Sequence, residues 1–145
     1  MQATPEQSSP RVLGDAESIP DSFVVQFCDQ AVGRFRDEIA DVEERDQVRE
    51  EQAQRRVVDA LTGEFQQSVG SRDWTVPERR VRQLAGDAIG LSLEFQHDHG
   101  YEPEGARWAA VRECREGEQA RELIAEQGRE LAAQARDRQC MGGER

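Results

Sequence analysis

The only two histidines, His97 and His99, are the residues whose type and spacing could most readily do chemistry. Two imidazoles separated by one residue can chelate a transition metal when the segment that carries them is extended. Further ligands would have to come from nearby residues, namely Asp98, Glu102, Glu104 or Cys114. The same pair is also typical of a solvated turn in which a histidine caps the C-terminus of the preceding helix. We therefore treat His97 and His99 as weak metal candidates and assign no metal or other cofactor.

Sequence motifs for other chemistry are absent. The chain contains no GxGxxG, P-loop, HExxH, GxSxG or EF-hand pattern, which are the common signatures of phosphate, zinc, nucleophile and calcium sites. Its 30 acidic residues offer too many candidates for a catalytic carboxylate pair to be identified. The sequence therefore favours a protein that is not an enzyme.

Cysteine usage and hydropathy predict a cytoplasmic protein. Cys28, Cys114 and Cys140 lie far apart and form no CxxC pair, which is typical of a reducing compartment. The chain does not begin with the basic and apolar regions of a signal peptide. No apolar run approaches the roughly 20 residues that span a bilayer, so no membrane segment is predicted.

The formal net charge is −11, and all 19 basic residues are arginine. This charge disfavours direct binding to nucleic acid or to an anionic membrane. It allows a basic partner, so one alternative function is an acidic inhibitor that mimics nucleic acid on such a partner. The simpler interpretation is a charged, solvated helix surface.

Residues 21–70 contain no proline and carry an apolar stripe at helical spacing. The stripe is interrupted by a charged section, residues 43–52, in which Val48 is the only apolar residue. A single helix over this span would be roughly 70 Å long, more than a compact chain of this size can enclose. We expect either one long or kinked helix or a break near residues 43–51 that forms a hairpin.

A stripe of this length needs a partner, because one compact bundle cannot cover it. We expect an unidentified protein or a second copy of the chain, as a homodimer, to contact this helix. The expected interface residues are Val24, Phe35, Ile39, Val42, Val57, Leu61 and Phe65.

Residues 76–95 are predicted to form a further helix. Thr75 and Glu78 have the spacing of a capping box, and an apolar stripe follows at Val81, Leu84, Ala88, Leu91 and Phe95. Residues 89–95 also alternate between apolar and other side chains, which is the period of a half-buried strand. The helix is favoured, and a short strand near 89–95 remains the alternative.

These elements predict an all-α fold, a bundle of about four helices, with α+β as the alternative. Residues 1–20 are expected to be a flexible N-terminal arm, residues 21–138 a single helical domain, and residues 139–145 a frayed tail. Gly117 is expected to break or bend the last helix. The predicted function is a non-enzymatic helical interaction or regulatory accessory module. A metal-binding protein or metalloenzyme using His97 and His99, and the acidic inhibitor, are the alternatives.

Overall fold

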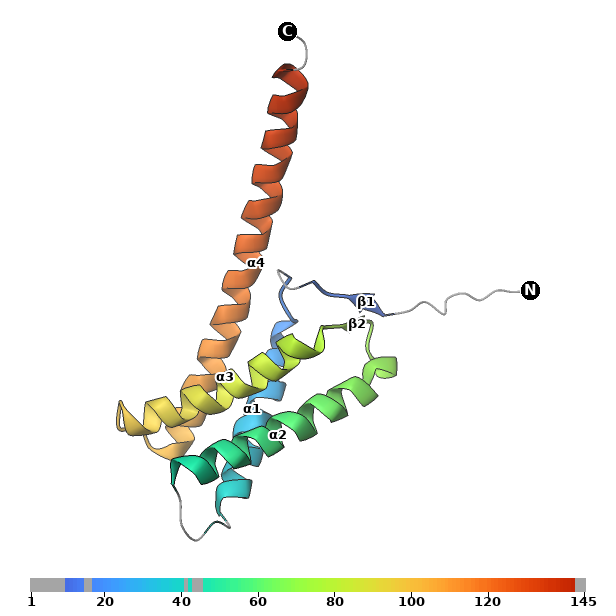
Figure 1. Cartoon of the computed structure of the whole chain (residues 1–145). Coiled ribbons are helices and arrows are strands. Elements are labelled where there is room, and N and C mark those ends of the chain that lie inside the picture. The colour runs from blue at the N-terminus through green and yellow to red at the C-terminus, as the bar shows by residue number, and fades with distance from the viewer. Residues whose placement is uncertain (1–9, 15–16, 41, 43–45, 143–145) are drawn as a thin grey trace, which may run out of the picture.

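The computed structural model describes residues 10–14, 17–40, 42 and 46–142, with side chains up to residue 138. It contains four helices and a two-stranded parallel sheet (Figure 1). The helices are α1 Asp21–Ala40, α2 Gln47–Gln67, α3 Glu78–His97 and α4 Pro103–Gly142. Strands β1 Arg11–Val12 and β2 Trp74–Thr75 are two residues each, and a short 3₁₀ turn, Val69–Ser71, precedes β2. The fold is therefore an all-α bundle, as predicted.

The first apolar stripe is divided between two helices. The chain leaves the helix after Ala40 and enters α2 at Gln47. Asp46 caps α2, because its carboxylate accepts a hydrogen bond from the Arg49 backbone N–H at 2.8 Å. A capping aspartate can start a helix without a preceding glycine or proline, so the predicted break is correct and the long-helix alternative is wrong.

Helix α1 lies at the centre of the bundle and packs against α2, α3 and α4. Its buried side chains lie on one face of the helix, at Val24, Phe27, Cys28, Ala31, Val32, Phe35 and Ile39. An aromatic group closes one end of this core, with Phe23 in ring contact with Phe27, Phe65 and Trp74 at centroid distances of 5.1–5.2 Å. Most of the core is built from small and branched aliphatic side chains, as the low aromatic content requires.

Helix α3 includes residues 89–95, so the strand alternative is wrong. Its buried face is turned from the predicted one: Ile89 is fully buried, whereas Leu91 and Phe95 are only partly buried. The reason is that α3 contacts α1, α2 and α4 together and therefore buries a wider arc than one stripe. The predicted capping box is absent, because Thr75 lies in β2 and the residue before α3 is Pro77, which makes no side-chain cap.

The segment before α1 is docked, at least from residue 10 onward. Leu13 donates its backbone N–H to the Thr75 carbonyl at 2.8 Å, continuing the parallel pairing of β1 and β2. The side chains of Leu13 and Ile19 are buried in the core. Leu13 and Ile19 therefore lie against the helices, and residues 1–9, 15 and 16 are outside the described part of the chain.

Helix α4 is continuous over 40 residues and passes through Gly117 without a break. At about 1.5 Å per residue it is roughly 60 Å long, and its C-terminal half projects beyond the bundle (Figure 1). It also extends past residue 138, where a frayed tail was expected. Residues 143–145 of that tail lie outside the described part.

Candidate interaction surface on the C-terminal helix

The projecting half of α4 receives almost no cover from the rest of the chain. Glu118 is its last buried residue, and Arg121 and Ala125 are partly buried. From Glu126 to Arg138 every side chain is exposed. An isolated helix of this length is only marginally stable in water, so this part of α4 lacks the tertiary contacts that usually hold a helix.

Exposed apolar side chains gather on this projecting half. Seven large apolar side chains are exposed among the described residues, and three of them lie within nine residues of α4. These are Leu123, Ile124 and Leu131, which are 61%, 67% and 62% exposed. Single exposed apolar residues are ordinary, but a cluster on one element indicates a contact surface.

Ile124 and Leu131 belong to a regular pattern that we call the α4 stripe, and Leu123 lies beside it. The stripe consists of Ala120, Ile124, Gln127, Leu131 and Gln134, in alternating steps of four and three residues. At 100° per residue, Glu122, Glu126, Arg129 and Arg136 lie on the side of the helix away from this stripe, and Glu130 and Asp137 lie beside it. Steps of four and three are the spacing by which one helix packs along another.

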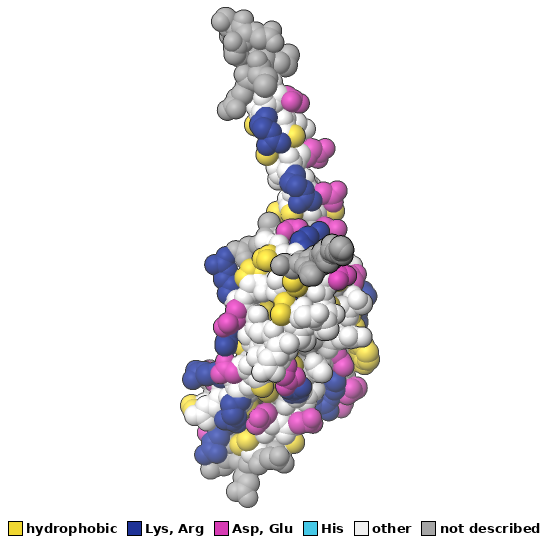
Figure 2. Space-filling model, turned by 90° about the vertical axis from the view of Figure 1, so that its right-hand side faces the viewer, with side chains coloured by type: hydrophobic (Ala, Val, Ile, Leu, Met, Phe, Trp, Pro, Cys, Tyr) yellow, Lys and Arg dark blue, Asp and Glu magenta, His cyan; other side chains and the backbone are white. Residues whose placement is uncertain are grey.

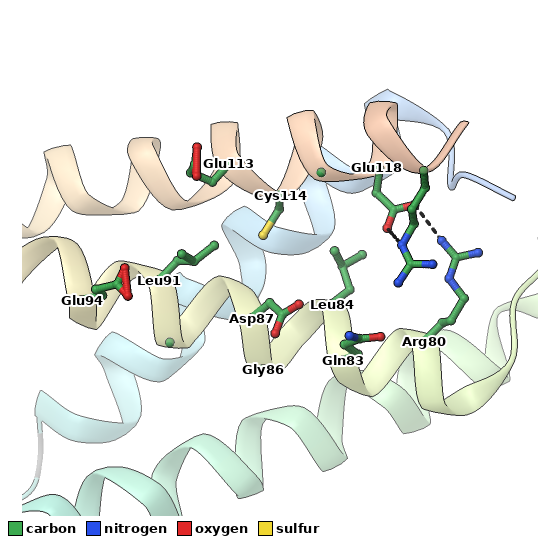
Figure 3. Close-up of a pocket in the computed structure, with 13 residues that line it drawn as sticks. Arg80, Gln83, Leu84, Gly86, Asp87, Leu91, Glu94, Glu113, Cys114 and Glu118 are labelled. Atoms are coloured by element: carbon green, nitrogen blue, oxygen red, sulfur yellow. Dashed lines mark hydrogen bonds and ion pairs between the residues drawn. The ribbon is translucent and has the colours of Figure 1, made fainter. Parts of the chain in front are cut away.

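A groove between α3 and α4 lies at the base of the α4 stripe. It has a volume of about 560 Å³ and is lined from α3 by Asp87 and Glu94 and from α4 by Glu113 and Gly117, among others. Figure 3 shows Glu94, Asp87 and Glu113 along this groove, with Arg80 and Glu118 at one end. Partial loss of hydration raises the pKa of the Asp87 carboxyl, an effect that nearby Arg121 offsets in part.

The buried end of the groove is a structural ion pair. Arg80 donates to Glu118 at 2.7 Å, and the two side chains are only 3% and 8% exposed. Arg80 also donates to the carbonyls of Gly14 and Glu17, and Glu118 accepts from the Ile19 N–H at 3.0 Å. All of these contacts hold the N-terminal segment against α3 and α4. We therefore assign this cluster a structural role rather than a binding role. Arg80 is thus buried and is an exception to the charged, solvated helix surface that the sequence predicts.

The residues expected to form an interface are placed inside the bundle. Six of the seven are buried within one chain, namely Val24, Phe35, Ile39, Val57, Leu61 and Phe65, and Val42 is partly buried. The break after α1 folds α2 back against α1 and lets one chain cover both halves of the stripe. These side chains therefore have no exposed surface to offer a partner, and a partner surface has to be sought elsewhere.

The two histidines are exposed at the end of α3. His97 is the last residue of the helix, and the His99 ring lies 5.5 Å from Phe95 and 6.4 Å from Tyr101. Within the described residues, no three His, Cys, Asp or Glu side chains are placed to share a metal ion. The pair thus lacks the further ligands that a metal site would need.

One cysteine lines the groove and contacts a second cysteine from α1. Cys114 lies at the wall of the groove and is nearly buried, next to Cys28 of α1, and both are free thiols. A hydrogen bond with Cys114, together with burial, raises the pKa of the Cys28 thiol. A thiol that stays protonated at neutral pH is a poor nucleophile. Cys28 is a small buried residue of the core, and the Cys140 side chain lies outside the described part.

An exposed tryptophan on α4 and a charged face of the molecule form two further surfaces. Trp108 of α4 is 57% exposed and, with Val25 and Arg115, lines a smaller hollow of about 370 Å³ on another side of the helix. On the face drawn in Figure 2, arginine and acidic side chains are interspersed rather than gathered into one field. Neither surface has the regular spacing of the α4 stripe.

Comparison of this chain with protein-family models, with curated protein sequences and with solved structures gave no match. None of the described helices combines the length and apolarity needed to cross a membrane.

Sequence reasoning missed the α4 stripe, although its signal is present in the sequence. The alternating steps from Ala120 to Gln134 can be read directly. This segment was predicted to lie in a single helical domain, and Gly117 was expected to break or bend the helix. The continuous, projecting helix leaves the stripe exposed.

Proposed function

We propose that this protein is a non-enzymatic helical interaction module that binds a protein partner through the α4 stripe. The observation that carries the proposal is the exposure of Leu123, Ile124 and Leu131 on a helix that extends beyond its own bundle. A bundle with a buried core supports the helix at its base, and the stripe is free for contact. The partner would bury the apolar side chains that are exposed along the projecting half of α4.

The chemistry of the remaining surface favours binding over catalysis. The α3–α4 groove is lined by carboxylates and by a buried ion pair, without an activated thiol or a set of metal ligands among the described residues. Two free, buried cysteines in contact are also compatible with a reducing compartment, so we propose a cytoplasmic location. A second copy of the chain, forming a homodimer, is one candidate for the partner.

Affinity capture from cells of the source organism tests the proposal. The bait is the full chain, either wild type or carrying Ile124→Glu and Leu131→Glu, which place two charges on the α4 stripe. Val48→Glu is the matched control, because Val48 is equally exposed, at 61%, but lies on α2. We expect a protein, or a differently tagged copy of this chain, to be retained by wild type and control and lost from the double variant. Equal retention by all three baits would contradict the proposal.

A further inference from the structure

The α4 stripe continues at both ends into residues of opposite charge. One step of three before Ala120 is Gly117, and one step of four before that is Glu113. One step of four after Gln134 is Arg138. The full pattern therefore runs from an acid at 113 to an arginine at 138, with uncharged residues at every step between them.

This arrangement is complementary to itself when two copies run antiparallel. A two-fold axis near residues 125–126 pairs the steps as Glu113 with Arg138, Gly117 with Gln134, Ala120 with Leu131, and Ile124 with Gln127. Each pair occurs twice, so both ends of the contact carry an acid opposite an arginine. A parallel pair would instead place Glu113 against Glu113 and Arg138 against Arg138, which is unfavourable.

The acidic groove strengthens the end contacts. Glu113 is exposed and lies along the α3–α4 groove with Asp87 and Glu94 (Figure 3). The guanidinium of Arg138 from a second copy would therefore approach three carboxylates. An arginine is well suited to this position because its planar group can contact two carboxylate oxygens at once.

The distribution of net charge also favours the antiparallel arrangement. Residues 119–138 carry four arginines and four acids, so this segment is neutral and the charge of −11 belongs to the rest of the chain. In an antiparallel pair the two acidic bundles lie at opposite ends of the contact. Their mutual repulsion is then weakened by distance and screening.

Resting on the proposed function, we infer that the α4 stripe is covered by a second copy of this chain in an antiparallel pair, with Glu113 of each copy against Arg138 of the other. The pair would hold two bundles apart on a two-helix rod. Each copy supplies the arginine that the partner's groove receives.

Sedimentation equilibrium of the full chain between about 1 and 100 μM tests this inference by charge reversal. Glu113→Arg and Arg138→Glu, each alone, should raise the dimer dissociation constant at least tenfold, because either change creates a like-charge contact at both ends. An equimolar mixture of the two variants should recover the dimer, because a mixed pair has opposite charges at both ends. The chain that carries both changes should recover it in part, because Asp87 and Glu94 still line the groove at both ends. Glu126→Arg is the matched control, since it reverses a charge on the opposite side of α4, and it should dimerise as wild type does.

Several results would overturn the inference. A monomeric wild type at 100 μM would exclude the second copy but leave the capture experiment to decide the proposed function. A dimer that ignores both single reversals, or a mixture that stays monomeric, would exclude this register. Circular dichroism should show unchanged helix content, since both positions are exposed. If either reversal unfolds the chain, Glu113→Gln and Arg138→Gln replace it, and a dissociation constant that neither changes would also exclude the register.

Discussion

At the scale of single residues, the largest departure from a simple apolar core is the ion pair of Arg80 and Glu118. Both charges are buried, and each also bonds to the backbone before α1. Such a pair adds little net stability compared with apolar residues, but the removal of one partner leaves an unpaired buried charge. The pair therefore explains how Gly14, Glu17 and Ile19 are held without a helix of their own.

Removal of the Glu118 carboxylate should destabilise the protein strongly. Glu118→Ala leaves Arg80 buried without its acid, and we expect the free energy of unfolding to fall by about 3–5 kcal/mol. Urea unfolding followed by circular dichroism measures this change. Arg80→Met together with Glu118→Leu removes both charges and should cost less than Glu118→Ala. If the double variant proves the less stable of the two, the pair has a different role.

The raised pKa of Asp87 predicts a pH-dependent cost to stability. A carboxyl whose pKa is higher in the folded than in the unfolded state favours folding when it is protonated, and it opposes folding once both states are ionised. The cost is thus absent below the unfolded pKa of about 3.9 and appears as the pH rises above it. We expect Asp87→Asn to raise the melting temperature at pH 7 and to leave it unchanged near pH 3. A lower melting temperature for this variant at pH 7 would show that the carboxylate is stabilising.

At the scale of elements, the apolar period predicted where helices lie better than which side of each helix is buried. The stripe in residues 76–95 correctly indicated α3, but it could not show that α3 contacts three other helices. Ile89 is not part of the predicted stripe, yet it is fully buried. Leu91 is part of that stripe, yet it is only partly buried. A single sequence carries no information on how many neighbours a helix has, and this number sets the width of its buried arc.

The burial of α3 makes a direct prediction about alanine substitutions. Ile89→Ala and Leu84→Ala should each lower the free energy of unfolding by about 2–5 kcal/mol, because they leave cavities in the core. Leu91→Ala should cost less than either, since part of its side chain is already in water. Chemical denaturation of the three variants gives the order. A larger loss for Leu91→Ala than for Ile89→Ala would mean that the buried arc is assigned to the wrong side.

The break between α1 and α2 was predicted from the sequence, whereas the continuity of α4 was not. The break between α1 and α2 follows from two features of the sequence. The apolar stripe is interrupted between Val42 and Ala53, where Val48 is the only apolar residue, and Asp46 is a good capping residue. The continuation of α4 through Gly117 was not predicted. A glycine costs a helix only about 1 kcal/mol, and the packing of α4 on α1 and α3 offsets this cost.

At the scale of the whole molecule, the structure consists of a closed bundle and a projecting helix. The sequence predicted the all-α bundle, because its periodic segments and low aromatic content have few other solutions. The candidate site could not be predicted, because exposure depends on which segment covers which. Val24 and Ile124 both lie on stripes with helical spacing, yet one is fully buried and the other 67% exposed.

The projecting part of α4 lacks the tertiary contacts that stabilise most helices, and a second copy would supply them. From Glu126 to Arg138 the helix has no buried side chain and includes Gly128. Such a stretch should open frequently in an isolated chain, since tertiary contacts supply most of a helix's stability. In the antiparallel pair the same stretch gains a partner along the α4 stripe.

Amide hydrogen exchange of residues 119–138, measured as protein concentration rises, tests the coverage of the α4 stripe by a second copy most directly. Exchange in this segment should slow markedly between about 1 and 100 μM, while residues 27–35 of α1, which lie in the bundle core, should keep the same rate at all concentrations. Ile124→Glu with Leu131→Glu should remove the concentration dependence. Fast exchange of residues 119–138 at every concentration of the wild-type protein would contradict the account.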